Sequence, residues 1–231
     1  DNSNPREYEL KNNITSIVKV LEQSKKPIIY LGQGCKDSVN ELRNFAITNK
    51  IPVTGTIHAK GIFDDHNELS LEWCGMHGHA AANFALQEAD CIIALGSRFD
   101  DRTTGSISEY APVARKNKAI IHVNIEASEF NKALTTNYNV HGTCKDFLEA
   151  ISKAMFRNFI TKEFYEKHIP WLHRIKELKD KYPFDLKNSS PFSKNEAYHM
   201  EEVINQLYLK TLYKDVIFTT GVGNHQMQSY Q

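Results

Sequence analysis

The sequence predicts an α/β protein with a doubly wound, mainly parallel sheet and helices on both faces of that sheet. Two observations support this fold class. Short apolar and β-branched runs alternate with segments of helical periodicity over the first 157 residues. These runs are continuously apolar rather than alternating between apolar and polar residues, which is typical of parallel strands covered on both faces.

The expected elements follow one another along the chain. Extended segments are expected over residues 28–31, 51–57, 91–97, 119–127 and 138–140. Helices are expected to end near residue 25, to follow residue 38, to span about 78–89 and to follow residue 143. Right-handed crossovers place the carboxyl ends of parallel strands on one edge, and such sheets bind ligands there at a topological switch point. The glycine-bearing turns after the strands are therefore expected to converge on one edge.

The composition changes after Met155, which suggests three segments. Residues 1–157 form the central α/β domain. Residues 158–194 are rich in Lys, Tyr, Phe and Pro and read as a linker with a helix over 162–181. Residues 195–231 hold one expected helix and one expected strand, which cannot bury a core alone, so they read as the truncated start of another domain. The first residue is Asp1 rather than Met, which suits a fragment or a processed product.

Charge and hydropathy exclude several classes of protein. Lys and Arg together number 28, as do Asp and Glu, so no global field favours nucleic acid or an anionic membrane. Apolar runs stay far below the roughly 20 residues of a membrane helix, and a soluble protein is expected. The four cysteines form no CxxC pair, which favours free thiols over disulfides or zinc. No nucleophile with its base and no metal-ligand spacing is present.

Two glycine-containing loops are candidates for ligand contact. Gly32 and Gly34 stand between a strand and a helix, where a backbone can approach a ligand closely and a helix N-terminus favours a negative group. Asp37 occupies the place of the third glycine of GxGxxG, so a plain turn is an equal alternative. The GMHG segment, with Met76 and His77 between glycines, suits a flat ligand, although an ordinary surface loop is the favoured alternative on this segment alone.

The stretch GSRFDDRTTG, directly after the apolar run CIIAL, is the most informative. It places Arg98, Asp100, Asp101 and Arg102 within five positions. Arginine presents a planar donor fork that suits phosphate or carboxylate, and the aspartates could hold those forks or accept from ligand hydroxyls. A solvated charge run is the alternative, but such runs seldom follow so apolar a strand. A binding role is therefore favoured.

Weaker candidates follow the later strands. Asn124 and Glu126 suit the hydroxyls of a ribose, although Glu126 could instead cap a helix. Gly142 and Thr143 could close over an adenine. The segment GVGNHQM, after an expected strand at 216–219, offers backbone N–H groups for a diphosphate. The residues alone thus indicate a dinucleotide-binding α/β domain without a complete catalytic apparatus.

The strings LSLEWCGMHG, ADCIIALGSRFDDRTTG, AIIHVNIEASEFNK and VIFTTGVGNHQM closely resemble the acetohydroxyacid (acetolactate) synthase catalytic subunits. The resemblance implies a three-domain enzyme that condenses pyruvate with pyruvate or 2-oxobutanoate, releases CO2 and serves branched-chain amino-acid synthesis. It implies FAD as a cofactor without net redox role, thiamine diphosphate with Mg²⁺ as the chemical cofactors, and homodimers or tetramers with a possible regulatory subunit. The linker with KYPF resembles that of eukaryotic, particularly fungal-like, members. The family resemblance implies that the protein is located in mitochondria if its source is eukaryotic, and otherwise in the cytoplasm.

The resemblance also assigns roles to residues. Arg102 would bind the carboxylate of the second substrate, with Asp101 positioning it. The residues that would contact FAD are Gly32, Gly34, Thr56, Ile57, His58, Met76, His77, Gly96, Arg98, Asn124, Glu126, Gly142 and Thr143. Those near thiamine diphosphate would be Val222, Asn224, His225 and Met227.

The sequence departs from the family pattern at several of these places. Gln33 replaces a small residue, Asn124 and Thr143 stand where aspartate is more usual, and Asn224 replaces glutamine. Gln228 begins a substitute for Trp-Ala-Ala. The glutamate that activates thiamine and the GDG metal motif are not in this sequence, so the chain alone is expected to be inactive.

Other enzymes and a non-enzyme remain as alternatives. These are another thiamine-diphosphate enzyme of the glyoxylate carboligase or pyruvate oxidase type, a nicotinamide-dependent oxidoreductase or deacylase on a similar sheet, and a non-catalytic nucleotide-binding remnant. The missing GxGxxG pattern and the GSRFDDRTTG stretch argue against the nicotinamide enzyme.

Overall fold

The computed structural model describes residues 5–157, 162–183 and 200–230. The chain divides into two compact units, residues 1–182 and residues 183–231. In the described ranges, no helix is both long and apolar enough to cross a membrane.

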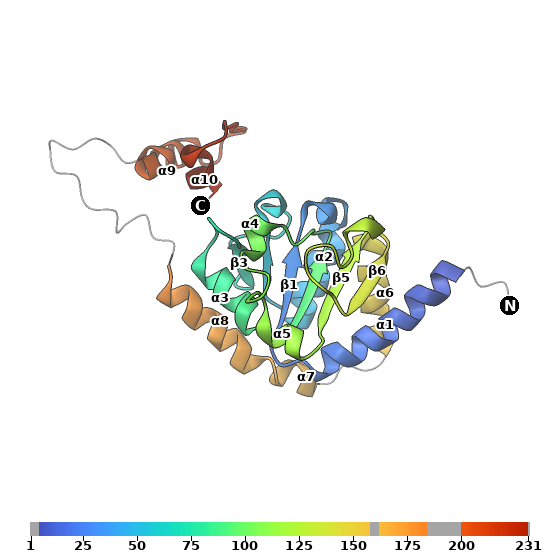
Figure 1. Ribbon diagram of the computed structural model, residues 1–231. Helices are drawn as coiled ribbons and strands as arrows, with labels where there is room; N and C mark the ends of the chain where they lie inside the picture. The colour runs from blue at the N-terminus through green and yellow to red at the C-terminus, as the bar shows by residue number, and fades with distance from the viewer. Residues whose placement is uncertain (1–4, 158–161, 184–199, 231) are drawn as a thin grey trace. The chain divides into compact units, whose positions relative to one another are not determined.

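The first unit is built on a six-stranded sheet in which every neighbouring pair is parallel (Figure 1). The strand order is β3-β2-β1-β4-β5-β6, so the order reverses between β1 and β4. The strands are β1 (Pro27–Leu31), β2 (Val53–Gly55), β3 (Ser70–Trp73), β4 (Cys91–Leu95), β5 (Ile120–Asn124) and β6 (Tyr138–His141). The predicted fold class and the five predicted strands of this unit are confirmed, and β3 is an additional strand.

Helices cover both faces of this sheet (Figure 1). One core lies under α1 (Pro5–Gln23), α2 (Val39–Asn49), α6 (Cys144–Arg157) and α7 (Lys162–Glu166). The other lies under α3 (Ala80–Glu88), α5 (Pro112–Lys116) and α8 (Ile169–Lys181). Alternate strand residues supply the two cores: Ile29 and Leu31 enter the first, and Ile28 and Tyr30 the second. This two-sided burial explains why the strands are apolar at consecutive positions.

The segment that the sequence placed in a linker contributes to the second core. Trp171, Ile175 and Leu178 of α8 are each 2% exposed or less. The indole N–H of Trp171 donates to the carbonyl of Pro27 over 2.9 Å, at the start of β1. Arg174 donates two hydrogen bonds, of 2.7 and 2.9 Å, to the carboxylate of Glu88 on α3. The first compact unit therefore extends to Tyr182.

The second unit contains α9 (Met200–Thr211) and α10 (Asn224–Tyr230). The predicted strand at 216–219 is wrong, because these residues lie outside any helix or strand. A strand needs a neighbour to accept its backbone hydrogen bonds, and none is described in this unit. Ile217 is 89% exposed, and the apolar side chains of Met200 and Val203 on α9 are also half exposed.

Candidate functional site

The turns after β1 and β4 pack against each other at the point where the strand order reverses. The N–H of Gly32 donates to the carbonyl of Leu95 over 2.8 Å, and the N–H of Gly34 donates to that of Gly96 over 3.2 Å. A Cβ on Gly32 would lie 2.1 Å from the carbonyl oxygen of Gly96, and Gly96 itself has a φ of +60°. The predicted convergence of these glycine turns is confirmed. Their small size is used to bring two backbones together at the switch point.

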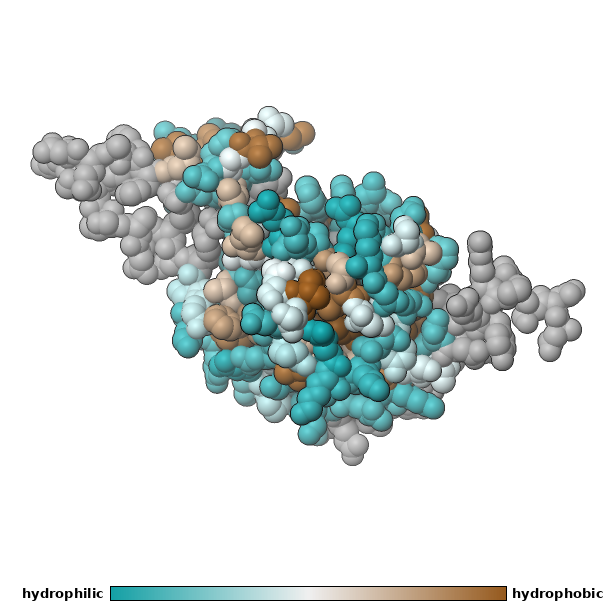
Figure 2. All heavy atoms as spheres, viewed as in Figure 1, coloured by the Kyte–Doolittle hydropathy of each residue, from teal (hydrophilic) through white to brown (hydrophobic). Residues whose placement is uncertain are grey.

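The other strand ends lie along the same edge, as expected of an all-parallel sheet. Thr56 donates its N–H to the carbonyl of Leu31 over 2.8 Å, which joins the turns after β2 and β1. The GMHG loop follows β3, and Gly142 follows β6. In the view of Figures 1 and 2, this edge is the upper rim of the first unit, and mostly hydrophilic residues cover it.

The GMHG loop is joined to the charged stretch after β4. The N–H of Met76 donates to the carbonyl of Arg102 over 2.8 Å. The Nη1 of Arg102 lies 3.6 Å from the Sδ of Met76. The two segments line a cavity of about 310 Å³ together with residues of α3 and Tyr110. The structure therefore brings together Met76, Asp101 and Arg102, which the sequence singled out in two separate motifs.

The acidic pair in this stretch has two different surroundings. Asp100 is the N-cap of α4 (Asp101–Thr104), and its carboxylate accepts the N–H of Thr103 over 3.2 Å. Asp101 and Arg102 are exposed on α4, and Arg98 is exposed before it. Among the described residues, no carboxylate forms an ion pair with Arg98 or Arg102. Asp100 is thus committed to the local fold, while both guanidinium groups face solvent.

The candidates after β5 and β6 differ in what remains open to a ligand. Asn124 is 6% exposed; its amide donates to the carbonyl of Ser97 over 2.9 Å and accepts the N–H of Glu126 over 3.0 Å. Thr143 accepts the N–H of Asp146 over 3.0 Å at the start of α6. Glu126 is exposed, and a Cβ on Gly142 would meet no atom within 4 Å. The Glu126 carboxylate and the open space at Gly142 are the parts of this group left for a ligand.

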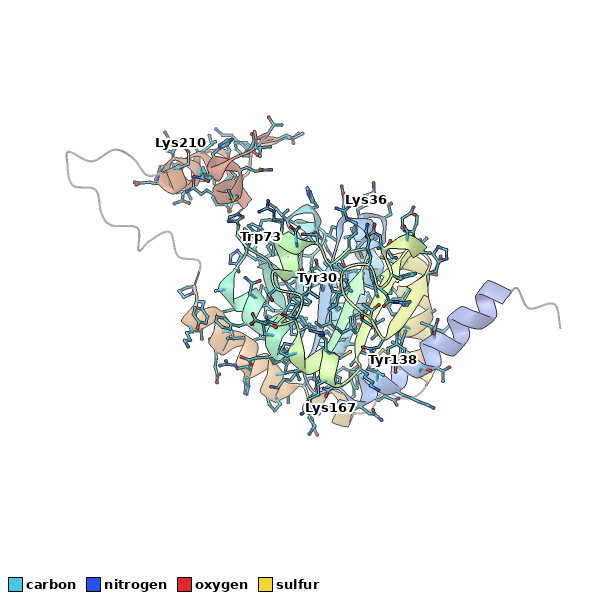
Figure 3. All side chains as sticks on the ribbon, viewed as in Figure 1. Tyr30, Lys36, Trp73, Tyr138, Lys167 and Lys210 are labelled. Atoms are coloured by element: carbon cyan, nitrogen blue, oxygen red, sulfur yellow. The ribbon has the colours of Figure 1, made fainter. Side chains whose placement is uncertain are left out.

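The remaining candidates of the first unit lie on the short helix η2 (Ile57–Ala59) and in the GMHG loop. Thr56 is buried, Ile57 is half-buried, and His58 and His77 are exposed. Lys36, on η1 (Gln33–Ser38) after the glycine turn, adds a positive charge that sequence reasoning did not single out (Figure 3). Its position two residues after Gly34 was the available signal.

The sequence also gave no indication of an ion network beside the GMHG loop, formed by Glu72, Lys60, His79 and Asp65. The Glu72 carboxylate on β3 lies 3.0 Å from the Nζ of Lys60 and 3.2 Å from the Nε2 of His79. Lys60 also pairs with Asp65 at 3.2 Å. Burial alone would raise the pKa of Glu72, but hydrogen bonds and charge from His79 and Lys60 outweigh it and lower the pKa to about 2. Glu72 has a φ of +59°, which a non-glycine residue adopts only when its surroundings hold it.

A buried histidine lies beneath the turn after β4. The Nε2 of His122 is 2.8 Å from the carbonyl of Ser97, and its side chain is fully buried between the rings of Phe99 and Phe130. Burial lowers the pKa of His122, so it is neutral at physiological pH. It therefore supports the turn rather than presenting a charge. The four cysteines are free thiols, as expected, and all four are buried.

The candidates near the end of the chain lie in the second unit. Val222 is 94% exposed, Gly223 has a φ of +148°, and Asn224 begins α10. His225 and Met227 follow on the same helix and are partly buried. In the part of the chain that the structure describes, no three His, Cys, Asp or Glu residues are grouped as metal ligands.

Comparisons with known proteins agree with the resemblance seen in the sequence. Residues 14–151 match the central domain of thiamine pyrophosphate enzymes. The mitochondrial acetolactate synthase catalytic subunit of Saccharomyces cerevisiae is 37% identical over 94% of this chain and 32% of its own length. The large subunit from Porphyra purpurea is 37% identical over 94% of this chain and 35% of its own, and the chloroplastic enzyme of Arabidopsis thaliana is 34% identical over 94% and 31%. The chain thus spans about a third of the length of the curated relatives it matches.

Proposed function

Since the chain belongs to the family of thiamine pyrophosphate enzymes, through their central domain, we propose that it forms the FAD-binding part of an acetolactate synthase catalytic subunit. The complete enzyme would condense pyruvate with pyruvate or 2-oxobutanoate and release CO2, in the synthesis of branched-chain amino acids. The observation that carries this proposal is the meeting of the glycine turns after β1 and β4 at the switch point of the sheet.

The shape and chemistry of the edge fit an elongated dinucleotide. Six parallel strand ends at about 4.8 Å spacing form a rim of about 24 Å. Arg98 and Lys36 offer exposed positive charge near the switch point, where a diphosphate would lie. The exposed Glu126 suits ribose hydroxyls toward β5 and β6, and Met76 with His77 suits the flavin toward β3. In this proposal Thr56, Ile57 and His58 line the ligand between these ends.

Arg102 is proposed to bind the carboxylate of the second 2-oxo acid. Its guanidinium is exposed, lines the cavity of about 310 Å³ and has no described carboxylate partner, so a bidentate contact with a small acid costs no existing ion pair. Asp101, also exposed on α4, would orient it.

The second unit contains only part of the proposed site for thiamine diphosphate. Val222, Asn224, His225 and Met227 surround the start of α10, and we propose that they contact thiamine diphosphate in the complete enzyme. Thiamine diphosphate supplies the carbon–carbon bond chemistry when bound. The described residues do not fit Mg²⁺, because no ligand group is assembled among them. We propose that the isolated chain binds FAD and forms no acetolactate. The complete enzyme is proposed to be a homodimer or tetramer with a regulatory subunit, in mitochondria if the source is eukaryotic and otherwise in the cytoplasm.

A ligand titration of the purified chain tests this function. FAD at 100 times its Kd is expected to stabilise the first unit by about 2.7 kcal/mol, whereas NAD at the same concentration gives no shift. The Arg98→Ala variant should bind FAD more weakly, and Lys116→Ala, an exposed cation on α5 before β5, should bind it normally. Stabilisation by NAD and not by FAD would point to a nicotinamide enzyme. Acetolactate formed by the pure chain with its cofactors would contradict the expected inactivity.

A further inference from the structure

Asn83 on α3 holds the loop that joins the two halves of the candidate site. Its amide accepts the N–H of Gly75 over 2.8 Å and donates to the carbonyl of the same residue over 2.9 Å. An asparagine of the right reach can satisfy both backbone groups of one residue, because its side chain carries a donor and an acceptor in one plane. One side chain therefore holds both the N–H and the carbonyl of Gly75.

Gly75 also packs closely against the backbone of Arg102. Its φ is +108°, which favours glycine, and a Cβ there would lie 2.7 Å from the carbonyl oxygen of Arg102. The next residue, Met76, donates its N–H to that same carbonyl over 2.8 Å. A change in the backbone at Gly75 is therefore expected to move Met76, Arg102 or both.

We propose that Asn83 is a positioning residue for this site, which sets Met76 and Arg102 in the geometry that a flavin and a 2-oxo acid carboxylate require. The proposal rests on the function proposed above for those two residues. Asn83 itself lines the same cavity of about 310 Å³ as Gly75, Met76 and Arg102. Its two hydrogen bonds to Gly75 therefore lie beside the proposed ligand sites. Its effect passes through the backbone of Gly75.

If Asn83 has this role, the loss of its hydrogen bonds should loosen two loops that are distant in sequence. Residues 75–78 and 102–105 are joined by the Met76 hydrogen bond to Arg102. In Asn83→Ala, which lacks both amide bonds, we expect hydrogen exchange to rise at least tenfold in both segments. In Asn83→Asp, which keeps the acceptor for the Gly75 N–H but faces the Gly75 carbonyl with an oxygen, we expect an intermediate rise. Loss of two hydrogen bonds should also weaken FAD binding by about tenfold.

The matched control is Asn49→Ala. Asn49 is buried, and its amide donates to the carbonyl of Phe45 over 2.8 Å at the far end of α2. This variant should lower the thermal midpoint while leaving the exchange of residues 75–78 and 102–105 and the Kd for FAD unchanged. Circular dichroism and tryptophan fluorescence establish that each variant is folded, and Asn83→Asp carries the test if Asn83→Ala does not fold.

The outcomes separate the two proposals. Joint loss of protection in both segments with weaker FAD binding supports the positioning role. Unchanged exchange in residues 102–105 in both Asn83 variants overturns it, as does a Kd for FAD equal to that of the control. If the unmodified chain binds no FAD, the proposed function fails, and the exchange measurement still decides whether Asn83 couples the two loops.

Discussion

The charge on Glu72 should stabilise the first unit in a way that depends on pH. Its carboxylate is held by Lys60 at 3.0 Å and His79 at 3.2 Å, and its strained backbone is fixed by Thr54 and Ser70, whose hydroxyls bond its carbonyl and N–H over 3.1 and 3.0 Å. The Glu72→Gln substitution removes the charge and keeps the size and the backbone bonds. It therefore isolates the contribution of the ion network.

The pKa of Glu72 gives the size of this contribution. A fall from the ordinary 4.5 to about 2 corresponds to about 3 kcal/mol at neutral pH, at about 1.4 kcal/mol for each pH unit. Because 29% of the side chain stays exposed, solvent screening should reduce the effect to about 2 kcal/mol. The folded-state pKa lies below the unfolded one. The stabilisation is therefore complete above about pH 4.5 and is lost as the pH falls toward about 2.

Urea unfolding followed by tryptophan fluorescence measures this directly. Both tryptophans, Trp73 and Trp171, are buried in the first unit, so the signal reports that unit alone. The difference in unfolding free energy between the chain and Glu72→Gln should be about 2 kcal/mol at pH 7 and should shrink between pH 4.5 and 3. The control Glu68→Gln, an exposed neighbour, should differ by less than about 0.5 kcal/mol. A difference for Glu72→Gln that does not change with pH would refute the electrostatic argument.

Three further predictions concern glycines, α8 and the thiols. Gly32→Ala should lower the free energy of unfolding in urea by more than about 2 kcal/mol, because its Cβ would meet a backbone oxygen at 2.1 Å. Gly142→Ala has open space around its Cβ and should lower it by less than about 1 kcal/mol. Equal losses in the two variants would contradict the packing of the turns. Trp171→Ala should cost about 3–5 kcal/mol, and a cost below about 1 kcal/mol would mean that α8 is not part of this core. Because all four cysteines are buried, a thiol reagent should react slowly with the folded chain and with four thiols after denaturation; rapid labelling of the folded chain would count against this burial.

The sequence predicted five of the six strands because burial on both faces of the sheet leaves apolar residues at consecutive positions. Strands such as Cys91–Leu95 are apolar at every position, since neighbouring residues enter opposite cores. The strand β3 lies at the edge of the sheet, where one side has no neighbouring strand, and it carries the charged Glu72. It therefore lacks the continuous apolar run that marks β1 and β4.

The sequence could not decide which surface an amphipathic helix covers. The periodicity of α8 was visible, but its docking depends on the Trp171 bond to Pro27 and the Arg174 bonds to Glu88, which join residues far apart in the chain. The opposite error occurred at 216–219, where an apolar run predicted a strand. Local sequence indicates that a segment can extend, but it pairs only when a neighbouring strand is present.

The same limit applies to the candidate site. Strand ends were enough to place the candidates of the first unit on one edge, but the partners of each polar atom come from other strands. The amide of Asn124 is hydrogen-bonded to Ser97 and Glu126, and the hydroxyl of Thr143 accepts a hydrogen bond at the start of α6. A ligand could use those atoms only by breaking bonds that hold the turns, at about 1 kcal/mol or more each. Among the described residues, no such hydrogen bond holds the side chains of Arg98 and Glu126, and Arg102 makes only a weak contact of 3.6 Å with the Sδ of Met76. A dinucleotide and a small acid bound at this edge should therefore depend on these three side chains most.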